Sequence, residues 1–296
     1  MTAPAHPPSP APITTWPFRP GVEVGSYRIE DVLGRGGLGV VYRARDLTSG
    51  RTLALKILRV GMSSSSKHLY RFLREARVTA RLRHPGIVPV VDAGLLRGYP
   101  FLALELIEGP SLELVLITSR KLTPERTLEL LLPVTTALAY AHENGVVHRD
   151  VKPANVLLGR SGQPFLTDFG LALDQDDPKQ ITWPGQALGT PAYVAPEQRR
   201  GDRATPLSDV YALGATLFEC LTGVLPGAVA PCPLGAAMER LAPETPAMLR
   251  ELVLRCLETD PLLRPPGALA VADVLRACRR TPVRPLRRTR TPPPGA

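Results

Sequence analysis

The stretch that decides the fold is His148-Arg149-Asp150-Val151-Lys152-Pro153-Ala154-Asn155, followed eighteen residues after Asp150 by Asp168-Phe169-Gly170. It comes directly after an expected helix end and the short apolar pair Val146-Val147. Any single tripeptide occurs by chance at roughly one position in 8,000, so either match alone is weak. Several matches in one order, each in its expected structural context, are not a chance event.

A glycine-rich segment lies N-terminal to this stretch, because Gly34-Arg35-Gly36-Gly37-Leu38-Gly39-Val40-Val41 fits G-x-G-x-x-G-x-V. Glycines let backbone N–H groups approach phosphate oxygens closely, since no Cβ intervenes. The segment is not a Walker A loop, because no Gly-Lys-Ser/Thr follows it. It is not a dinucleotide-binding fingerprint either, because β-like sequence follows rather than a helix. Alone it indicates either a phosphate-binding loop or an ordinary glycine-rich hairpin.

Lys56 lies within the apolar, strand-like run Leu53-Ala54-Leu55-Lys56-Ile57-Leu58. A buried ammonium group needs a partner of opposite charge. Glu75 is the only acid between Ile57 and Val91, in the middle of an otherwise basic helical segment. We therefore expect Glu75 to neutralise Lys56 if that helix packs on the sheet, the alternative for Glu75 being an i,i+4 pair with Arg71.

The pattern of the chain predicts two lobes of an α+β fold. In the first, strand-like runs over 27–33, 39–46 and 51–58 predict an antiparallel meander, and a helix follows over 67–83. Two more strands are expected around 87–96 and 101–106 before 108–110 breaks the pattern. The small β-rich lobe with one main helix is thus assigned to residues 27–107.

After this break the chain is mainly helical, over an expected larger lobe at 108–279. Thr123-Pro124-Glu125 has the N-cap, N1 proline and early acid of a helix start, and Asn144-Gly145 ends that helix after Glu143. Further helices are expected near 208–221, 246–259 and 267–279. The proline-rich lead (1–20) and the basic Pro/Arg-rich tail (280–296) are predicted to be disordered.

Composition excludes several classes of protein. With 296 residues, 44% of them hydrophobic, the chain can bury a core and is not disordered as a whole. The net charge of +9 includes six arginines, and no acid, over 279–296, so the lobes are nearly neutral and no specific nucleic-acid binding is predicted. The four cysteines lack metal-site spacing and are expected to be reduced. We expect neither a signal peptide nor a membrane span, and hence a cytoplasmic protein.

Together these motifs resemble those of eukaryotic-type (Hanks-type) serine/threonine protein kinases, especially the bacterial ones, over residues 27–279. The resemblance continues in Gly189–Glu197, Ser208–Gly214 and Asp260–Pro265, whose Arg264 is expected to pair with Glu197. It implies the bilobal kinase fold. It also implies transfer of the γ-phosphoryl group of ATP, with Mg²⁺ or alternatively Mn²⁺, to Ser/Thr hydroxyls of protein substrates in bacterial signal transduction. Autophosphorylation, with self-association of the kinase, is expected as well.

The resemblance also implies roles for single residues. Asp150 would orient the acceptor hydroxyl, Lys152 would neutralise the γ-phosphate, and Lys56, aligned by Glu75, would hold the other phosphates. Asn155 and Asp168 would hold the metal ion, because hard cations take oxygen ligands. The remaining ATP-pocket residues would include a gatekeeper (Leu104) and a hinge; they are Leu33, Gly34, Gly36, Gly37, Gly39, Val41, Ala54, Leu104, Glu105, Ile107 and Leu157.

The segment from Asp168 to Glu197 resembles an activation segment. In the family an arginine at the position of Arg149 usually binds a phosphorylated residue there. Thr182 and Thr190 carry its only aliphatic hydroxyls; Thr190 matches a position near the acceptor, which makes Thr182 the expected phosphosite. Three carboxylates offer an alternative partner for Arg149 or for the 67–83 helix: Asp174, Asp176 and Asp177.

Two other interpretations remain open. A pseudokinase or nucleotide-sensing scaffold would not need the complete set Lys56, Glu75, Asp150, Asn155 and Asp168. A small-molecule phosphotransferase of related fold would not need Lys152, the 189–197 segment or Arg264. The sequence departs from the family over 222–245, which is short and rich in Pro and Gly where a fuller substrate-docking helix is usual, so peptide specificity is left open.

Overall fold

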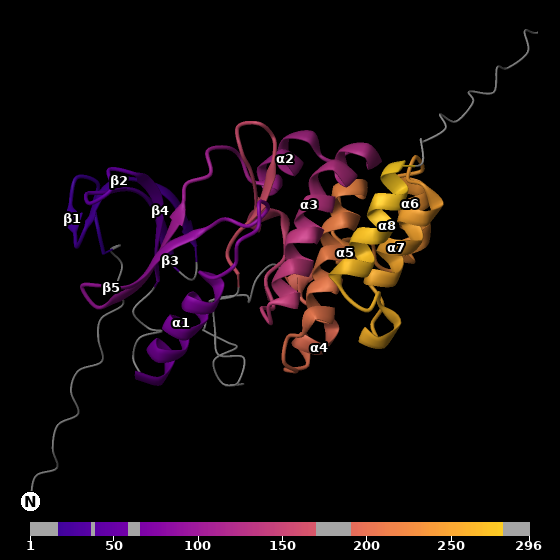
Figure 1. Ribbon diagram of the computed structural model, residues 1–296. Helices are drawn as coiled ribbons and strands as arrows, with labels where there is room; N and C mark the ends of the chain where they lie inside the picture. Colours follow the sequence, from indigo (N-terminus) through magenta and orange to yellow (C-terminus); the bar gives the residue numbers. More distant parts are fainter. Residues whose placement is uncertain (1–16, 37–38, 59–65, 170–190, 281–296) are drawn as a thin grey trace, which may run out of the picture.

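The computed structural model describes residues 17–36, 39–58, 66–169 and 191–280. Figure 1 shows a lobe built on a curved β-sheet, with one helix beside it, next to a second lobe made of packed helices. The chain passes between them after β6, so the expected α+β fold of two lobes is confirmed. Within the described residues, no helix is both long and apolar enough to cross a membrane.

The small lobe contains a six-stranded antiparallel sheet in the order β1-β2-β3-β4-β6-β5. Side chains alternate between its faces: along β4, Leu53, Leu55 and Ile57 are buried, whereas Ala54 and Lys56 lie on the opposite face. The predicted meander is therefore confirmed. The strands are β1 (Glu23–Val24), β2 (Tyr27–Gly36), β3 (Gly39–Asp46), β4 (Thr52–Leu58), β5 (Val90–Leu96) and β6 (Tyr99–Glu105).

Helix α1 (Ser66–Thr79) packs on the sheet beside β5 and β6. Ala76 is fully buried at this contact, in a cluster with Val90 and Leu102. The small alanine lets the helix lie close to the strands. The neighbouring Glu75 is therefore held near the edge of the contact, facing the large lobe.

The folded part of the small lobe begins before residue 27. The side chain of Phe18 is only 5% exposed and packs on Tyr42 and Tyr99, and the Tyr42 hydroxyl donates to the Phe18 carbonyl at 3.0 Å. The prediction of disorder over 1–20 is thus wrong for residues 17–20, while 1–16 lie outside the described residues. A single aromatic among prolines gives no periodic pattern, but it buries a large apolar area.

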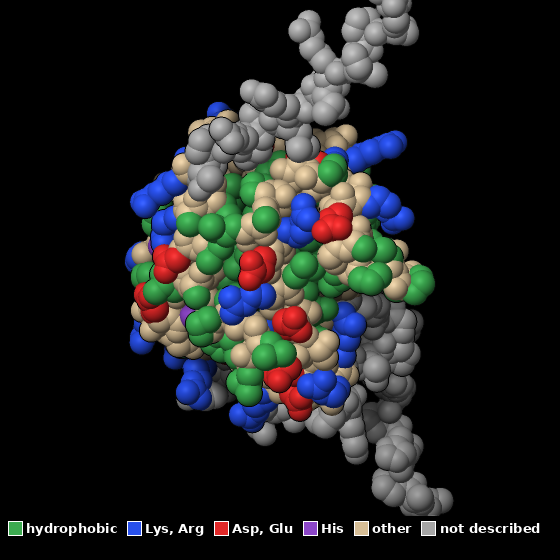
Figure 2. All heavy atoms as spheres, turned by 90° about the vertical axis from the view of Figure 1, so that its right-hand side faces the viewer, with side chains coloured by type: hydrophobic (Ala, Val, Ile, Leu, Met, Phe, Trp, Pro, Cys, Tyr) green, Lys and Arg blue, Asp and Glu red, His purple; other side chains and the backbone are tan. Residues whose placement is uncertain are grey.

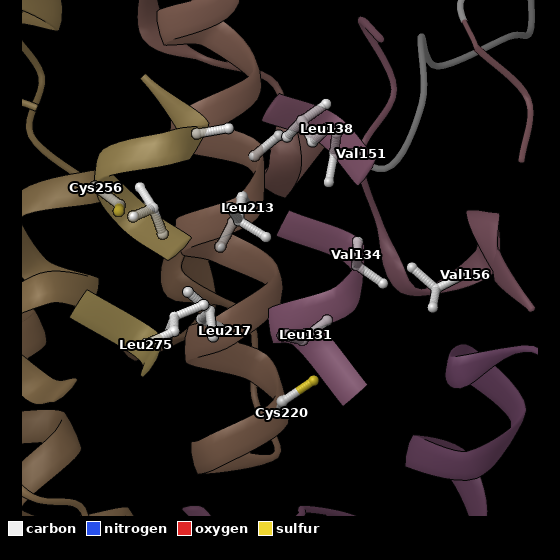
Figure 3. Packing of buried hydrophobic residues seen from close by; sticks show 14 of the residues in the cluster. Leu131, Val134, Leu138, Val151, Val156, Leu213, Leu217, Cys220, Cys256 and Leu275 are labelled. Atoms are coloured by element: carbon white, nitrogen blue, oxygen red, sulfur yellow. The ribbon is translucent and has the colours of Figure 1, made fainter. Parts of the chain in front are cut away.

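In the large lobe, helices α3 and α5 pack side by side at the centre (Figure 1). Figure 3 shows Leu131, Val134 and Leu138 of α3 beside Leu213 and Leu217 of α5 in one apolar core. The helices are α2 (Leu112–Ser119), α3 (Pro124–Glu143), α4 (Pro196–Arg199), α5 (Pro206–Thr222), α6 (Leu234–Leu241), α7 (Ala247–Cys256) and α8 (Ala268–Arg280).

The predicted ends of α3 are confirmed. The Thr123 side chain accepts a hydrogen bond from the Arg126 N–H at 3.2 Å, and Asn144 and Gly145 end the helix, with Gly145 at φ 72°. Helix α2 was not expected from the sequence. Its apolar residues lie on the exposed as well as the buried side, Leu114 and Ile117 being exposed, so it lacks the period that identifies an amphipathic helix.

A small hairpin carries the loops at the junction of the lobes. It consists of β7 (Val156–Leu158) and β8 (Pro164–Leu166), paired antiparallel. The loop that ends α3 leads into β7, and β8 leads directly to Asp168. The hairpin therefore brings Asn155, just before β7, next to the segment just after β8, and the Thr167 N–H donates to the Asn155 carbonyl at 3.0 Å.

Candidate active site

A buried carboxylate holds the loop that carries the catalytic candidates. Asp209, in the first turn of α5, accepts from the backbone N–H groups of His148 at 2.7 Å and Arg149 at 2.8 Å. Its Oδ2 also lies 2.8 Å from Nε2 of His142. Arg149 has a left-handed φ of 70°, so these bonds fix a strained turn immediately before Asp150. The rigid core of the large lobe thereby determines where Asp150 lies.

His148 supports the same loop from inside the protein. Its fully buried ring lies 4.6 Å from the ring of Phe169, centroid to centroid. Nδ1 accepts from the Asp150 N–H at 3.2 Å, so Nε2 is the nitrogen that donates to the Thr167 carbonyl at 2.9 Å. Burial lowers the pKa of His148, because the imidazolium would lose its hydration. His148 therefore acts as a neutral structural link between Asp150 and the segment preceding Asp168.

Asp150 is oriented by two side-chain donors. Lys152 Nζ lies 2.8 Å from Asp150 Oδ2, and Asn155 Nδ2 donates to the same oxygen at 2.9 Å. Asn155 Nδ2 also donates to the Asp150 carbonyl at 2.7 Å. The Asp150 side chain is still partly exposed, so it can meet a second molecule. The structure thus brings together the three residues that the sequence placed in one motif.

Lys56 does not pair with Glu75, contrary to the sequence-based expectation. Its Nζ lies 2.8 Å from Oδ1 of Asp168, and the two side chains are 16% and 28% exposed. The expectation considered only carboxylates close to Lys56 in the chain. Folding brings Asp168, more than a hundred residues further on, to the end of β8 opposite β4.

Glu75 instead joins α1 to the large lobe. Its Oε1 lies 3.2 Å from Nη1 of Arg149, with the side chains 33% and 34% exposed. Arg149 is the residue expected to bind a phosphorylated activation segment. That segment's residues 170–190, including Thr182, Thr190 and the three aspartates, lie outside the described residues. In this structure, a carboxylate of the small lobe binds the guanidinium.

Five of the eleven expected nucleotide-pocket residues lie near the junction between the sheet and the hairpin. Ala54 of β4 lies opposite Leu104 of β6 in the strand register, and both belong to one apolar cluster with Ile107 and Leu157. Glu105 ends β6 and is partly exposed beside Arg51. Ala54, Leu104, Ile107 and Leu157 thus contribute to one apolar cluster at the lobe junction.

The glycine-rich hairpin joins β2 and β3, with Leu33, Gly34 and Gly36 on β2 and Gly39 and Val41 on β3. A Cβ on Gly39 would collide with the carbonyl oxygen of Ile57, so glycine is required there by the close approach of β4. A Cβ on Gly34 or Gly36 would meet no other atom within 4 Å. Their lack of a side chain is therefore not explained by packing. Gly37 lies outside the described residues.

The predicted pair between Arg264 and Glu197 is confirmed. The guanidinium makes two bonds of 2.8 Å to the two carboxylate oxygens, and Ser208 Oγ donates to Glu197 Oε1 at 2.8 Å. Burial alone would raise the pKa of Glu197, but the bonds from Arg264 and Ser208 outweigh it and leave the pKa lowered. This pair fastens the segment leading into α4 to the base of the large lobe.

One contact beside this segment was not predicted from the sequence. The Tyr193 hydroxyl donates to Oε2 of Glu219 on α5, and burial raises the pKa of Glu219. The tyrosine lies in the 189–197 motif, but nothing in the spacing indicates which residue of α5 it meets. The contact ties the end of the activation segment to the central helix.

The sequence matches the protein kinase domain family over residues 27–271. It is 39% identical over 285 residues to the serine/threonine-protein kinase PknA of Mycobacterium tuberculosis, covering 92% of this chain and 65% of that protein. It is 38% identical over 271 residues to the probable serine/threonine-protein kinase SCO3848 of Streptomyces coelicolor, covering 86% of this chain and 40% of that protein.

A solved structure shows the same architecture. The kinase domain of PknI from M. tuberculosis superimposes with a TM-score of 0.71 at 30% sequence identity, covering 88% of this chain and 98% of that domain. The chain spans less than two thirds of the two full-length relatives, so the shared part is the kinase domain. This family is one that uses ATP and a divalent metal ion. The chain belongs to the protein kinase family, among the Hanks-type serine/threonine kinases of bacteria.

Proposed function

We propose that this chain transfers the γ-phosphoryl group of ATP to Ser or Thr hydroxyls of protein substrates, itself included, in bacterial signalling. The observation that carries the proposal is Asp150, a partly exposed carboxylate held by Lys152 and Asn155 on a loop fixed to α5. Such a carboxylate can accept a hydrogen bond from an acceptor hydroxyl and direct its oxygen toward phosphorus. Two mycobacterial relatives of this chain, PknA and PknH, are named as serine/threonine kinases.

The donor set at the lobe junction fits a divalent metal ion. Asp168 offers a carboxylate, and Asn155 uses its amide nitrogen to hold Asp150, which leaves its amide oxygen for a cation. Oxygen ligands of this kind suit Mg²⁺, with Mn²⁺ as the alternative. The ATP–metal complex, when bound, supplies the electrophilic phosphorus and neutralises charge on the phosphates.

The chain's own residues then have separate tasks. Asp150 orients the acceptor hydroxyl and takes its hydrogen bond, while Lys152 places a positive charge beside the same carboxylate. Lys56 now neutralises Asp168, so it must share or leave that carboxylate to bind a phosphate. Glu75 would align Lys56 only after leaving Arg149. On this proposal, the pairs Lys56–Asp168 and Glu75–Arg149 both have to rearrange before the site is assembled.

We assign the nucleotide pocket to the residues at the lobe junction and the lobes to 27–107 and 108–279, with residues 17–26 added to the small lobe. The proposed pocket residues besides Lys56 are Leu33, Gly34, Gly36, Gly37, Gly39, Val41, Ala54, Leu104, Glu105, Ile107 and Leu157. Thr182 is the proposed phosphosite, and Thr190 the proposed neighbour of the acceptor. The proposal for these threonines rests on the sequence alone.

The decisive experiment is phosphate transfer from radiolabelled ATP to a generic protein substrate by the wild type and by Asp150→Asn. We expect a loss of about 10²–10⁴-fold in turnover, because the amide cannot accept the hydroxyl proton. Binding of a fluorescent ATP analogue should persist. The matched control is Asp202→Asn, an exposed aspartate beside Arg200. Equal turnover by wild type and Asp150→Asn would refute the assignment, and wild type that binds ATP but never turns over would favour the nucleotide-sensing scaffold.

A further inference from the structure

The face of α1 that points away from the sheet gathers three arginines around a pocket. Leu73, Arg74, Arg77, Val78 and Arg81 line a depression of about 360 Å³. At about 100° per residue the four positions within α1, namely 73, 74, 77 and 78, cover one continuous arc of about 140° of helix surface, and Arg81 follows in the turn after the helix. Ala76 and Thr79, which are buried toward the sheet, lie on the opposite side. The pocket is therefore separate from the active site, although both share one helix.

The three arginines have no partner within the part of the chain that the structure describes. Arg74, Arg77 and Arg81 form no ion pair or side-chain hydrogen bond with any described residue. By contrast, Arg83 just beyond bonds the carbonyls of Ala80 and Leu82. Like charges three and four positions apart on a helix repel one another. Such an arrangement is costly for the isolated chain and is relieved by an anionic ligand.

Helix electrostatics explain only part of this cluster. Cations near a helix C-terminus interact favourably with the last carbonyl groups, which accounts for Arg77 and Arg81 close to the end of α1 at Thr79. The effect falls off within one turn and does not account for Arg74. Nor does it account for the apolar side chains of Leu73 and Val78 in the same depression, Val78 being exposed.

We propose that this face, the α1 arginine face (Leu73, Arg74, Arg77, Val78 and Arg81), is a docking site for an acidic peptide segment of a partner protein. The occupant would carry two or three carboxylates or a phosphate, together with an apolar side chain for the pocket. Guanidinium groups bind such anions through paired hydrogen bonds. Among the residues whose side chains the structure describes, no aromatic ring lines the pocket for the base stacking on which single-stranded nucleic acids depend, and a peptide is favoured by the pairing of arginines with apolar side chains.

Docking there would act on the active site through Glu75, an effect that rests on the proposed function. Glu75 follows Arg74 directly, and its ion pair with Arg149 holds α1 to the large lobe. A ligand that pulls on the outer face of α1 therefore biases whether Glu75 stays with Arg149 or turns toward Lys56. The binding itself does not depend on catalysis.

The test is fluorescence anisotropy of a labelled peptide, Gly-Leu-Asp-Glu-Leu-Asp-Glu-Gly, titrated with the full chain without ATP. We expect Arg74→Glu/Arg77→Glu/Arg81→Glu to weaken binding by about tenfold or more, and salt to weaken the wild type. The control Arg240→Glu/Arg255→Glu/Arg279→Glu makes the same charge change on exposed arginines of α6, α7 and α8. The affinity of this control variant for the peptide should stay within about threefold of the wild-type affinity. Equal weakening by both triple variants would overturn the proposal, because only overall charge would matter.

Further arms distinguish the possible occupants. A peptide with both leucines replaced by serine should bind several-fold more weakly if the pocket takes an apolar side chain. The triple glutamine variant at the three α1 positions, checked by thermal unfolding, guards against a folding defect. Binding by Asp174→Asn/Asp176→Asn/Asp177→Asn but not by wild type would mean that the chain's own acids occupy the face. Binding to phosphatidylglycerol vesicles but not to peptide would mean a lipid. Either result would overturn the proposal.

A last arm separates this inference from the proposed function. Saturating peptide should change the turnover of wild type on a generic protein substrate and leave that of the α1 triple variant unaltered. Unchanged turnover in wild type that binds the peptide would refute the coupling to Glu75. Absence of all turnover, with peptide binding intact, would refute the kinase proposal while supporting the docking site.

Discussion

Arg264 and Lys56 each hold a carboxylate at 2.8 Å, the first within the large lobe and the second across the junction of the lobes. The side chains of the pair Arg264–Glu197 are 0% and 7% exposed, whereas those of Lys56–Asp168 and Arg149–Glu75 are 16–34% exposed. Glu197 also has Ser208 as a second donor. The pair Arg264–Glu197 within the large lobe is therefore fixed by burial, while the two pairs between the lobes remain in contact with water and can exchange partners.

The same contrast holds for the backbone of the catalytic loop. Asp209 receives two N–H groups and a histidine from the loop, all inside the large lobe. Across the junction, α1 is tied to that loop by the single described pair Arg149–Glu75. The large lobe can thus serve as a fixed platform for Asp150 while the small lobe moves over it.

The largest expected effect comes from breaking the buried pair. Arg264→Met should lower the free energy of unfolding by about 3–5 kcal/mol, because it leaves Glu197 charged and buried. Urea denaturation followed by fluorescence measures it. Arg276→Met is the matched control, since its pair with Asp273 is exposed and should contribute less than about 1 kcal/mol. Similar losses for both would show that burial does not separate the two kinds of pair.

A fixed contact also exists in the small lobe, and removing it should have a slightly smaller effect. Phe18→Ala should destabilise the protein by about 3 kcal/mol, because it empties the site between Tyr42 and Tyr99. Phe18→Leu, which keeps most of the apolar volume, should lose less. If the alanine variant unfolds at the same urea concentration as wild type, residues 17–20 are not part of the folded lobe.

Phe18 also shows where sequence reasoning ends. The meander, α3 with both its ends, and the pair Arg264–Glu197 were predictable, because period, capping residues and motif spacing are local signals or follow from the family resemblance. Helix α2 was not, because it has no polar face to set a period. Phe18 was not, since one aromatic residue in a proline-rich lead carries no pattern.

The contacts of the candidate site also differ in whether the sequence predicts them. Asp150, Lys152 and Asn155 come together because eight consecutive residues contain them, and their mutual contacts follow from that short loop. The partner of Lys56 could not be predicted, because Asp168 and Glu75 are both carboxylates and the choice depends on how the lobes sit. The charged residues of this network can be identified from the sequence, whereas the three-dimensional structure is needed to show which of them form ion pairs.

His148 gives a pH-dependent test of whether burial fixes the contacts within the large lobe. Its pKa is lowered by burial, so the unfolded chain, with a histidine pKa of about 6.5, takes up the proton first as the pH falls. The neutral His148 ring contributes fully to the free energy of unfolding above its pKa in the unfolded chain. This contribution declines as the pH falls toward its lowered pKa in the folded protein. The slope approaches about 1.4 kcal/mol per pH unit.

Urea denaturation between about pH 7.5 and pH 5.5 measures this slope, and His148→Asn should flatten it. Burial also lowers the pKa of His84, which acts in the same direction, so His84→Asn provides the comparison. A steeper loss of stability in His148→Asn than in wild type on acidification would contradict a neutral buried imidazole. That outcome would mean that the contacts of His148 are not fixed by burial.

The smallest effect on stability is expected for the pair Arg149–Glu75. A double-mutant cycle with Arg149→Ala and Glu75→Gln should give a coupling of less than about 1 kcal/mol, because both side chains are about one third exposed. The cycle is needed because Arg149 makes further contacts, which a single substitution would also remove. A coupling above about 2 kcal/mol would place this pair with Arg264–Glu197 instead.

Turnover should respond to the same substitution out of proportion to stability. If Glu75 leaves Arg149 to align Lys56, Glu75→Gln removes a charge that the assembled site requires, and turnover should fall by about tenfold or more, equivalent to about 1.4 kcal/mol. Arg149→Ala, measured on chains treated with phosphatase, should lose less, because it releases Glu75 toward Lys56. Raising the salt concentration should weaken the coupling in the cycle, since the pair is open to screening. Equal losses of turnover for both variants would mean that the ion pair of this structure already belongs to the active form, and that the junction between the lobes is as fixed as the core below it.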